Sequence, residues 1–146
     1  MLKIKSYERV NSIAEAYELN QKKSACVLGG MVCMTTLHDL ETNAAMNEFT
    51  GGAVRESLRH IVGVQFRNCA TVGGSIFGRY GFSDVLTMFL AMDTWVDMYQ
   101  AGRIPLTEFV TQKKDRDILQ SVIVKKTPLK VTYLSQRNSE TDFPVL

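Results

Sequence analysis

The stretch that decides the fold reads Arg67-Asn68-Cys69-Ala70-Thr71-Val72-Gly73-Gly74, and Ser75 follows it. It places two consecutive glycines between hydroxyl-bearing residues. Glycine allows backbone conformations that other residues avoid, and it lets the chain approach a ligand closely. Backbone N–H groups in such a turn converge on an anion such as a pyrophosphate. We therefore expect residues 72–76 to form a glycine-rich turn, with the hydroxyls of Thr71 and Ser75 within reach of phosphate oxygens.

A second glycine pair stands earlier in the chain, in Leu28-Gly29-Gly30-Met31. It ends an apolar run at residues 25–28, whose length and bounding glycines favour a buried strand followed by a tight turn. By itself, a glycine pair after a strand is more often a plain turn than a binding site. With two such pairs, two interpretations remain: plain turns, or a site for a nucleotide or dinucleotide. Neither a P-loop nor a Gly-x-Gly-x-x-Gly fingerprint is present.

The composition is that of one ordinary globular domain, with 146 residues of which 45% are apolar and 22% charged. The balance of 17 basic and 15 acidic residues is too even to predict nucleic acid as a partner. We find no secretory signal at the start of the sequence and no apolar stretch long enough to cross a bilayer. The sequence therefore predicts a cytoplasmic protein without a membrane span.

Residue types that carry metal or hydrolytic chemistry are scarce. The three cysteines, Cys26, Cys33 and Cys69, form no Cys-x-x-Cys pair, and free thiols in a reducing cytoplasm are the simplest interpretation. They and the two histidines show no metal-ligand spacing, so no metal site is predicted. The sequence has no readable Ser/His/Asp or Cys/His arrangement, and we predict no catalytic side chain.

Helices are predicted where a capping residue precedes a run with its apolar residues on one face. We expect a helix over residues 13–20 after Asn11 or Ser12, a short one from Thr36 to Leu40 with Asp39 completing a capping box, and one over residues 54–62 that Gly63 ends. The polar residues 65–71 indicate a connector.

The second half of the chain mixes a helix with strands. Ser83 or Asp84 caps the helix, and its apolar stripe is formed by Val85, Met88, Phe89 and Met92, which we interpret as core packing. Strands are expected over residues 95–99 and 118–124, with a turn at Gly102 and with residues 131–134 as the hairpin partner of the second strand across Pro128. Helices and strands do not alternate regularly, which indicates the α+β class.

Together with its flanks, the opening stretch resembles the FAD-binding domain of molybdopterin dehydrogenases, the family of the xanthine dehydrogenase and CO dehydrogenase medium subunits. That family carries Gln-Ile-Arg-Asn, then Ala-Thr-Val-Gly-Gly-Asn-Ile, then a Ser-Asp pair. The matching segments here are Gln65-Phe66-Arg67-Asn68, Ala70-Thr71-Val72-Gly73-Gly74-Ser75-Ile76 and Ser83-Asp84. Other family segments are similar to residues 34–41, residues 103–109, Arg137-Asn138 and Asp142-Phe143-Pro144-Val145-Leu146, so the likeness covers nearly the whole chain.

The chain also departs from the family pattern. Met31-Val32 stands where a hydroxyl and a polar residue are usual, Ser75 where Asn is usual, and Tyr133 where Lys is frequent. Cys33 is joined almost directly to Met34, without the strand-bearing stretch that separates these elements in the family, and the family's C-terminal subdomain does not follow. The resemblance therefore predicts a domain shortened internally and at its C-terminus.

The resemblance implies an α+β fold of the CO dehydrogenase flavoprotein or PCMH-like type, in an incomplete form. We expect a single partial FAD-binding domain over residues 1–146. Within it, residues 1–33 would form a strand-helix-strand unit with the first glycine loop. Residues 34–146 would hold the second glycine loop and an antiparallel sheet.

The resemblance also implies a site in which both glycine loops hold the FAD pyrophosphate. The first loop would contribute Val27, Leu28, Gly29, Gly30, Met31 and Val32. The second would contribute Ala70, Thr71, Val72, Gly73, Gly74 and Ser75. Asp84, after Ser83, would hydrogen-bond hydroxyls of the sugar-like chain of the flavin, and Ile118 or Leu119 would pack near the isoalloxazine ring.

Three side chains near these motifs have competing roles. Arg67 either reaches a phosphate or supports the glycine loop by bonding backbone carbonyls, and we favour support because such a loop needs a rigid base. Trp95 is predicted to lie in the core and not to stack on a flavin. His60 is predicted to be a surface or helix-capping residue.

By resemblance, the function is that of an electron-transfer flavin subunit in a molybdenum hydroxylase complex. Its partners would be a molybdopterin-binding large subunit and a [2Fe–2S] small subunit, with NAD or another electron acceptor. Electrons would reach FAD from the iron–sulfur subunit and leave to the acceptor. The alternative is a non-catalytic assembly or scaffold domain that kept the fold and lost flavin binding.

Overall fold

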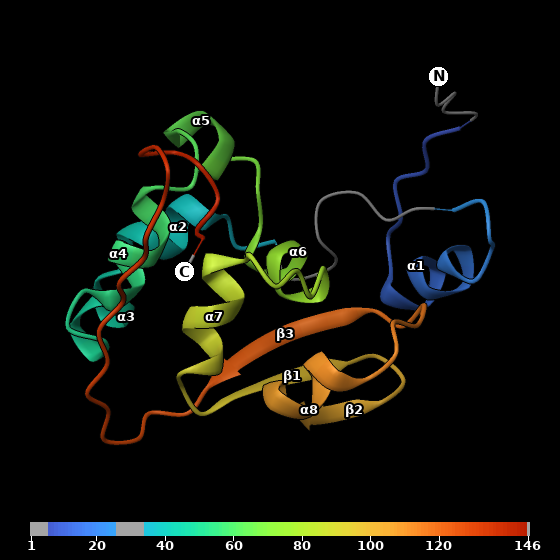
Figure 1. Cartoon of the computed structure of the whole chain (residues 1–146). Helices are drawn as coiled ribbons and strands as arrows, with labels where there is room; N and C mark the ends of the chain where they lie inside the picture. The colour runs from blue at the N-terminus through green and yellow to red at the C-terminus, as the bar shows by residue number, and fades with distance from the viewer. Residues whose placement is uncertain (1–5, 26–33, 146) are drawn as a thin grey trace.

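A three-stranded antiparallel sheet lies beneath a group of short helices (Figure 1). The computed structural model describes residues 6–25 and 34–145. Its first helices are α1 (Ile13–Asn20), α2 (Leu37–Thr42), α3 (Ala44–Phe49), α4 (Ala53–Arg59), α5 (Val64–Arg67), α6 (Val72–Phe77) and α7 (Asp84–Leu90). They are followed by β1 (Thr94–Met98), β2 (Gly102–Pro105), α8 (Leu106–Thr111) and β3 (Leu119–Val124). This architecture confirms the α+β prediction. In the described part of the chain, no helix has the length and apolar character needed to cross a membrane.

Local capping explains where the predicted helices begin. The Ser12 hydroxyl accepts a hydrogen bond from the Glu15 N–H, and the Ser83 hydroxyl accepts one from the Leu86 N–H. Thr36 and Asp39 form the predicted capping box, in which each side chain accepts from the backbone N–H of the other residue. These bonds satisfy N–H groups that have no partner inside the helix, so the starts of α1, α2 and α7 agree with the sequence.

The glycine-rich segment forms a helix, and the predicted turn over residues 72–76 is wrong. Thr71 is the N-cap of α6, and Val72 and Ile76 are buried in the core. The Thr71 position is fixed by an antiparallel bridge to Thr36. Burial of the two aliphatic side chains and the fixed cap outweigh the low helix propensity of the adjacent glycines, which is about 1 kcal/mol per glycine relative to alanine.

The predicted connector over residues 65–71 and the predicted end of the preceding helix also need correction. Residues Val64–Arg67 form α5, and α4 ends at Arg59, before Gly63. Val62 takes a left-handed backbone conformation with φ 49°, which stops the helix. The Arg67 side chain then bonds the carbonyl oxygens of Arg59 and Ile61, which a continuing α4 would have used internally.

The sheet has the order β2-β1-β3, with both pairings antiparallel. The predicted strands at residues 95–99 and 118–124 exist with small shifts, but the predicted hairpin of the second with residues 131–134 is wrong. β3 pairs with β1, and residues 125–138 contain no strand. Tyr133 is instead buried against the core, with 9% of its surface exposed. The Asp117 carboxylate accepts from the backbone N–H groups of Gln100 and Ala101 and so closes the turn between β1 and β2.

One hydrophobic core runs from α2 through α4, α6 and α7 to the sheet. The apolar stripe of α7 is buried as predicted, and it includes Val85, Met88 and Phe89. α6 packs against β3 and α8 packs against β1 and β2, so helices and sheet share this core. The α7 helix thereby fixes the orientation of its own first residue, Asp84, relative to α4 and α6.

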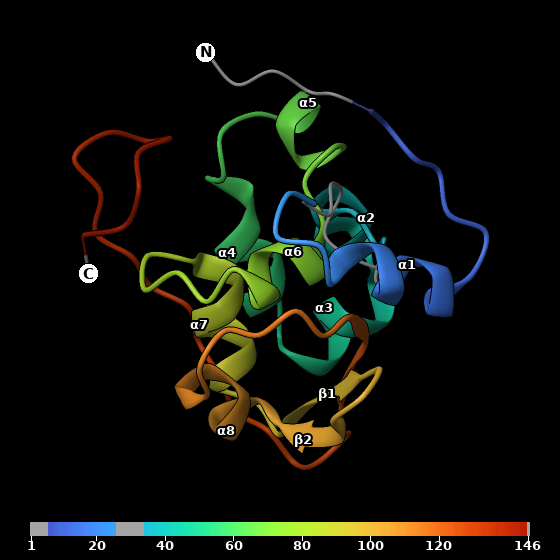
Figure 2. The same cartoon turned by 90° about the vertical axis from the view of Figure 1, so that its right-hand side faces the viewer.

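Two segments lie at opposite ends of the molecule. Helix α1 buries none of its residues, and it is held by Arg116, which donates to the carbonyl oxygens of Asn20 (2.6 Å) and Lys22 (2.7 Å). The segment after β3 passes along the far side of α4 and α7 from α1 and returns towards the start of α7 (Figures 1 and 2). This returning segment supplies one wall of the cavity described next.

Candidate functional site

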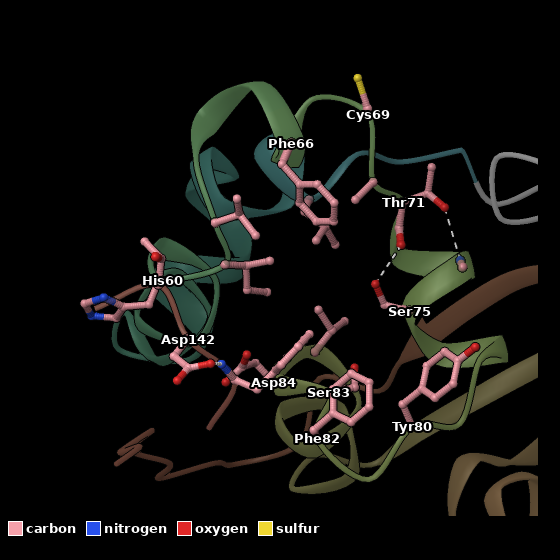
Figure 3. A pocket seen from close by; sticks show the side chains of 18 of the residues that line it. His60, Phe66, Cys69, Thr71, Ser75, Tyr80, Phe82, Ser83, Asp84 and Asp142 are labelled. Atoms are coloured by element: carbon pink, nitrogen blue, oxygen red, sulfur yellow. Dashed lines mark hydrogen bonds between the residues drawn. The ribbon is translucent and has the colours of Figure 1, made fainter. Parts of the chain in front are cut away.

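A cavity of about 510 Å³ lies between the starts of α6 and α7, the α4–α5 connection and the returning C-terminal segment (Figure 3). Its volume falls within the range of about 300–1,000 Å³ that is usual for small-molecule and cofactor pockets. Its lining residues are Leu37, His60, Ile61, Val62, Phe66, Cys69, Ala70, Thr71, Gly74, Ser75, Tyr80, Phe82, Ser83, Asp84, Val85, Arg137, Thr141, Asp142 and Phe143.

The first wall is the start of α6. The Thr71 hydroxyl accepts a hydrogen bond from the Gly74 N–H at 3.1 Å, and the Ser75 hydroxyl donates to the Thr71 carbonyl oxygen at 3.0 Å. The Ala70 carbonyl oxygen accepts from the Leu37 N–H at 2.9 Å, next to the Thr36–Thr71 bridge. Two sequence segments far apart in the chain therefore hold this wall in place, and its hydroxyls line the cavity.

The second wall is the start of α7, where a buried carboxylate has two partners from the C-terminal segment. Asp84 exposes only 6% of its surface, and its Oδ1 atom accepts hydrogen bonds from the Tyr133 hydroxyl and from Nη2 of Arg137. Burial, followed by the hydrogen bond to Asp84 and the charge of that carboxylate, raises the pKa of Tyr133 to about 12. The phenol is therefore a neutral donor at physiological pH. Ser83 uses its hydroxyl as the N-cap of α7.

Aromatic side chains form the third part of the lining. The rings of Tyr80 and Phe82 stack with centroids 5.3 Å apart, and the ring of Phe143 tilts against Phe82 at 4.6 Å. Phe66 points into the cavity from α5 (Figure 3). These rings are partly exposed and leave flat apolar faces that a planar aromatic ligand can cover.

Arg67 supports the site from behind, as predicted from the sequence. It is 6% exposed, and its Nε atom bonds Glu41 Oε2 at 2.8 Å while Nη1 donates to the carbonyl oxygens of Arg59 and Ile61. Its guanidinium is thus used to fix the α4–α5 connection. His60 is the C-cap residue of α4 and accepts a hydrogen bond from Nε of Arg59, in agreement with its predicted capping role.

Trp95 lies elsewhere. It is half-buried on β1, its Nε1 donates to Asp93 at 2.8 Å, and the Lys125 ammonium lies 4.1 Å from the ring centroid. The prediction that Trp95 is a core residue is therefore wrong, because Lys125 covers a ring that the sheet leaves partly open. Trp95 does not line the cavity.

The structure brings most of the predicted second-loop residues to one place. The residues of this group that line the cavity are Ala70, Thr71, Gly74, Ser75, Ser83 and Asp84. Val72 and Gly73 are buried within α6, and Ile118 and Leu119 are buried in the core and outside the cavity lining. The predicted first-loop residues Val27, Leu28, Gly29, Gly30, Met31 and Val32 lie outside the described residues. The proposed contacts of all these residues with FAD stay predictions.

Several lining residues were missed by sequence reasoning, among them Phe66, Tyr80, Phe82 and Phe143. Aromatic residues spread over distant positions carry no periodic signal. The Asp142-Phe143-Pro144 segment was noticed only as a likeness to the family, without a role. Its contact with Phe82 depends on the long-range path of the chain after β3.

Comparisons with known proteins address the family and the fold. Residues 1–128 match the family model described as the FAD binding domain in molybdopterin dehydrogenase. A search of curated proteins finds no match. Among solved structures, quinoline 2-oxidoreductase from Pseudomonas putida 86 matches with a TM-score of 0.68 and 16% identity, over 77% of this chain and 42% of that chain.

A second solved structure has the same relationship to this chain. It is carbon monoxide dehydrogenase from Hydrogenophaga pseudoflava, in a form that lacks the Mo-pyranopterin moiety of the molybdenum cofactor. It matches with a TM-score of 0.63 and 18% identity, over 77% of this chain and 42% of that chain. At these identities the two structures show the fold alone, and the chain spans less than half the length of each. The family match covers most of the chain, which therefore belongs to the family of FAD-binding domains of molybdopterin dehydrogenases, whose cofactor is FAD.

Proposed function

We propose that this chain is the FAD-binding part of an electron-transfer subunit in a molybdenum hydroxylase complex of the xanthine dehydrogenase type. In the proposed complex, electrons pass from a [2Fe–2S] small subunit through FAD to NAD or another acceptor, and a molybdopterin-binding large subunit oxidises the substrate. The observation that carries the proposal is the cavity in which the segment at Thr71 and Ser75, which resembles the family motif, meets Asp84 and an aromatic wall. We also propose a cytoplasmic location.

The residues that line the cavity fit the chemistry of FAD. Hydroxyls on Thr71, Ser75 and Ser83 suit the phosphate and sugar-like parts of the cofactor, because a hydroxyl offers one donor and two acceptor positions and those of Ser75 and Ser83 are only partly used within the protein. The stacked faces of Tyr80 and Phe82 suit an aromatic ring system. The pairing of Arg137 with Asp84 leaves the lining without a buried charge that would repel the cofactor.

The protein's share of the proposed work is binding and orientation. FAD when bound supplies one- and two-electron transfer. Thr71, Ser75 and Ser83 would hold its polar parts, and Phe66, Tyr80 and Phe82 would exclude water from its apolar part. Electron transfer needs no side chain as acid or base, which agrees with a lining in which neither histidines nor cysteines gather into a reactive pair.

Support for the partners comes from the relatives. The first solved protein is named as an oxidoreductase and the second as a dehydrogenase, in a form that lacks the Mo-pyranopterin moiety of its molybdenum cofactor. This chain spans 42% of each of those chains. Its partner subunits and its electron acceptor are therefore part of the proposal. NADH added to the FAD-loaded complex tests the acceptor, because it should bleach the visible flavin band if NAD is the physiological partner.

The decisive experiment is binding of FAD by the whole chain. After incubation with FAD and desalting, we expect a yellow protein with quenched flavin fluorescence. At a free FAD concentration of about 100 times Kd, binding should stabilise the fold by about 2.7 kcal/mol, which corresponds to a rise in Tm of roughly 10 °C. Riboflavin, which lacks the phosphates, serves as the control ligand and should bind far more weakly. A protein that stays colourless and shows no thermal shift overturns the proposal and favours the scaffold alternative.

A further inference from the structure

We propose that Asp84, through Arg137, is a positioning residue that anchors the wall of the cavity formed by residues 135–143. This inference deepens the proposed function and rests on it. The sequence motif alone assigns Asp84 to the hydroxyls of the flavin chain. The structure gives its Oδ1 atom a second task, because two partners within the protein bond it, the Tyr133 hydroxyl and Nη2 of Arg137.

Arg137 is the centre of this anchor. Its side chain is 7% exposed and bonds in three directions: Nη2 to Asp84 Oδ1 at 2.5 Å, Nη1 to the Asp142 carbonyl oxygen at 2.6 Å, and Nε to the Ser135 hydroxyl at 3.2 Å. One guanidinium therefore closes residues 135–142 into a loop and ties that loop to the start of α7. The planar fork of arginine makes such simultaneous bonds possible, whereas a lysine ammonium is a single point charge.

The anchored loop supplies a face of the cavity. Thr141, Asp142 and Phe143 all line it, and the Phe143 ring contacts Phe82 with centroids 4.6 Å apart. Figure 3 shows Asp142 beside Asp84, on the side of the cavity opposite Thr71. Removal of the loop would open the cavity on this side and expose its contents to water.

Among the residues that the structure describes, few other hydrogen bonds hold the loop in place. Residues 125–145 contain no helix or strand, so no regular hydrogen-bond ladder supports them. The backbone bond from the Val145 N–H to the Gln136 carbonyl oxygen (2.8 Å) closes the loop on itself but does not attach it to the rest of the protein. The contacts with the start of α7 therefore decide the position of this wall.

The two charges act as a unit. Asp84 and Arg137 are both buried, and a buried ion that loses its partner is strongly destabilised by the missing solvation. Substitution of either residue should therefore release the loop, and substitution of both should do little further harm. Residues that act through one interaction give non-additive effects of this kind.

The test compares Asp84→Asn, Arg137→Met and the double variant with the wild-type chain in two measurements. The first is hydrogen exchange of residues 135–145 in the protein without FAD. The second is the Kd for FAD from the quenching of flavin fluorescence. We expect both single variants to speed exchange in this loop at least tenfold and to raise the Kd at least about tenfold, with the double variant close to the worse single one.

The matched control is Arg103→Met, which removes an exposed Arg103–Asp97 pair on the sheet and should change neither measurement. If Asp84→Asn raises the Kd while Arg137→Met leaves both the Kd and the exchange unchanged, Asp84 acts on the cofactor without anchoring the loop, and the inference is overturned. Unchanged exchange of the loop in both single variants overturns it as well.

Failure of the proposed function gives a different result. If the wild-type chain does not bind FAD, the proposed function fails, and the exchange measurement alone still decides whether Asp84 anchors the loop. Should Arg137→Met not fold, Arg137→Lys keeps a cation beside Asp84 but cannot also hold the Asp142 carbonyl. We expect this variant to fold and to exchange faster at residues 138–143, and unchanged exchange there overturns the anchor.

Discussion

Thr36 and Thr71 face each other in an antiparallel bridge, and each is the N-cap of the helix that follows it. The bridge is flanked by two backbone hydrogen bonds of 2.9 Å, from Leu37 N–H to the Ala70 carbonyl and from Val72 N–H to the Thr35 carbonyl. Helices α2 and α6 therefore start side by side although they are far apart in the sequence. The wall of the cavity at Thr71 depends on this shared start.

Removal of the Thr71 cap should destabilise the protein modestly. Thr71→Val keeps the branched shape but loses the oxygen that accepts from the Gly74 N–H. We expect a loss of about 1 kcal/mol in the free energy of unfolding, the usual effect of a lost N-cap. Urea unfolding measures this. The control Thr87→Val lies at an exposed position of α7 and should change stability by less than about 0.5 kcal/mol. Equal effects of the two substitutions would contradict the capping role.

Loss of the Arg67 side chain should be far more costly. Arg67→Met leaves the nearly buried Glu41 carboxylate without its cation and two backbone carbonyls without their donor. We expect a loss of about 3–5 kcal/mol, as for other broken buried ion pairs. Arg103→Met breaks an exposed pair with Asp97 and should lose only about 0–1 kcal/mol. Both values come from denaturant unfolding, and a similar loss for the two variants would mean that Arg67 is not a structural support.

Tyr133, which bonds the cavity residue Asp84, predicts a loss of stability at alkaline pH. The folded protein holds the Tyr133 proton more tightly than the unfolded chain, because burial and the Asp84 carboxylate raise its pKa from 10.0 to about 12. This contribution is fully present below about pH 10 and is lost as the pH rises towards 12. Unfolding free energies across this range should fall less steeply in Tyr133→Phe than in the wild type.

The control for this alkaline effect is Tyr7→Phe. Tyr7 is 74% exposed, so its replacement should leave the pH profile of the wild type unchanged. A Tyr133→Phe profile that runs parallel to the wild-type profile would show that the pKa of this phenol is not raised in the folded state.

A branched side chain at Gly74 should block the cavity. Gly74 lies in its lining, and Gly74→Val adds three carbon atoms there. We expect the Kd for FAD to rise at least about tenfold, equal to about 1.4 kcal/mol of binding free energy. Ala45→Val is the matched control, since Ala45 is an exposed position of α3 and is not part of the lining. Unchanged FAD affinity in the Gly74 variant would place the phosphate-binding site elsewhere.

The local parts of the fold could be predicted from the sequence, because their causes lie within a few residues. The caps at Ser12, Thr36 and Ser83 and the buried stripe of α7 are examples. The helix over Gly73 and Gly74 could not be predicted from propensity. It depends on a bridge to Thr36 that forms only when the chain folds.

The partner of β3 shows the same limit. The alternation of residues 131–134 is that of a strand, and a short connection favours a hairpin. In the structure β1 occupies one edge of β3, and Tyr133 packs towards Asp84. The site could be predicted only in part. Family motifs located Thr71, Ser75 and Asp84. The partners of Asp84 come from a segment whose path no local pattern reveals.

The closing loop at Arg137 also bears on the order in which this protein is made. A ribosome delivers α2, α4, α6 and α7 well before residues 137–143, at about 5–20 residues per second, and helices can begin to pack as they emerge. The face of the cavity that Thr141 and Phe143 supply is therefore synthesised after the walls formed by these helices. We expect the cavity of a nascent chain to stay open on that side until the Arg137 side chain reaches Asp84.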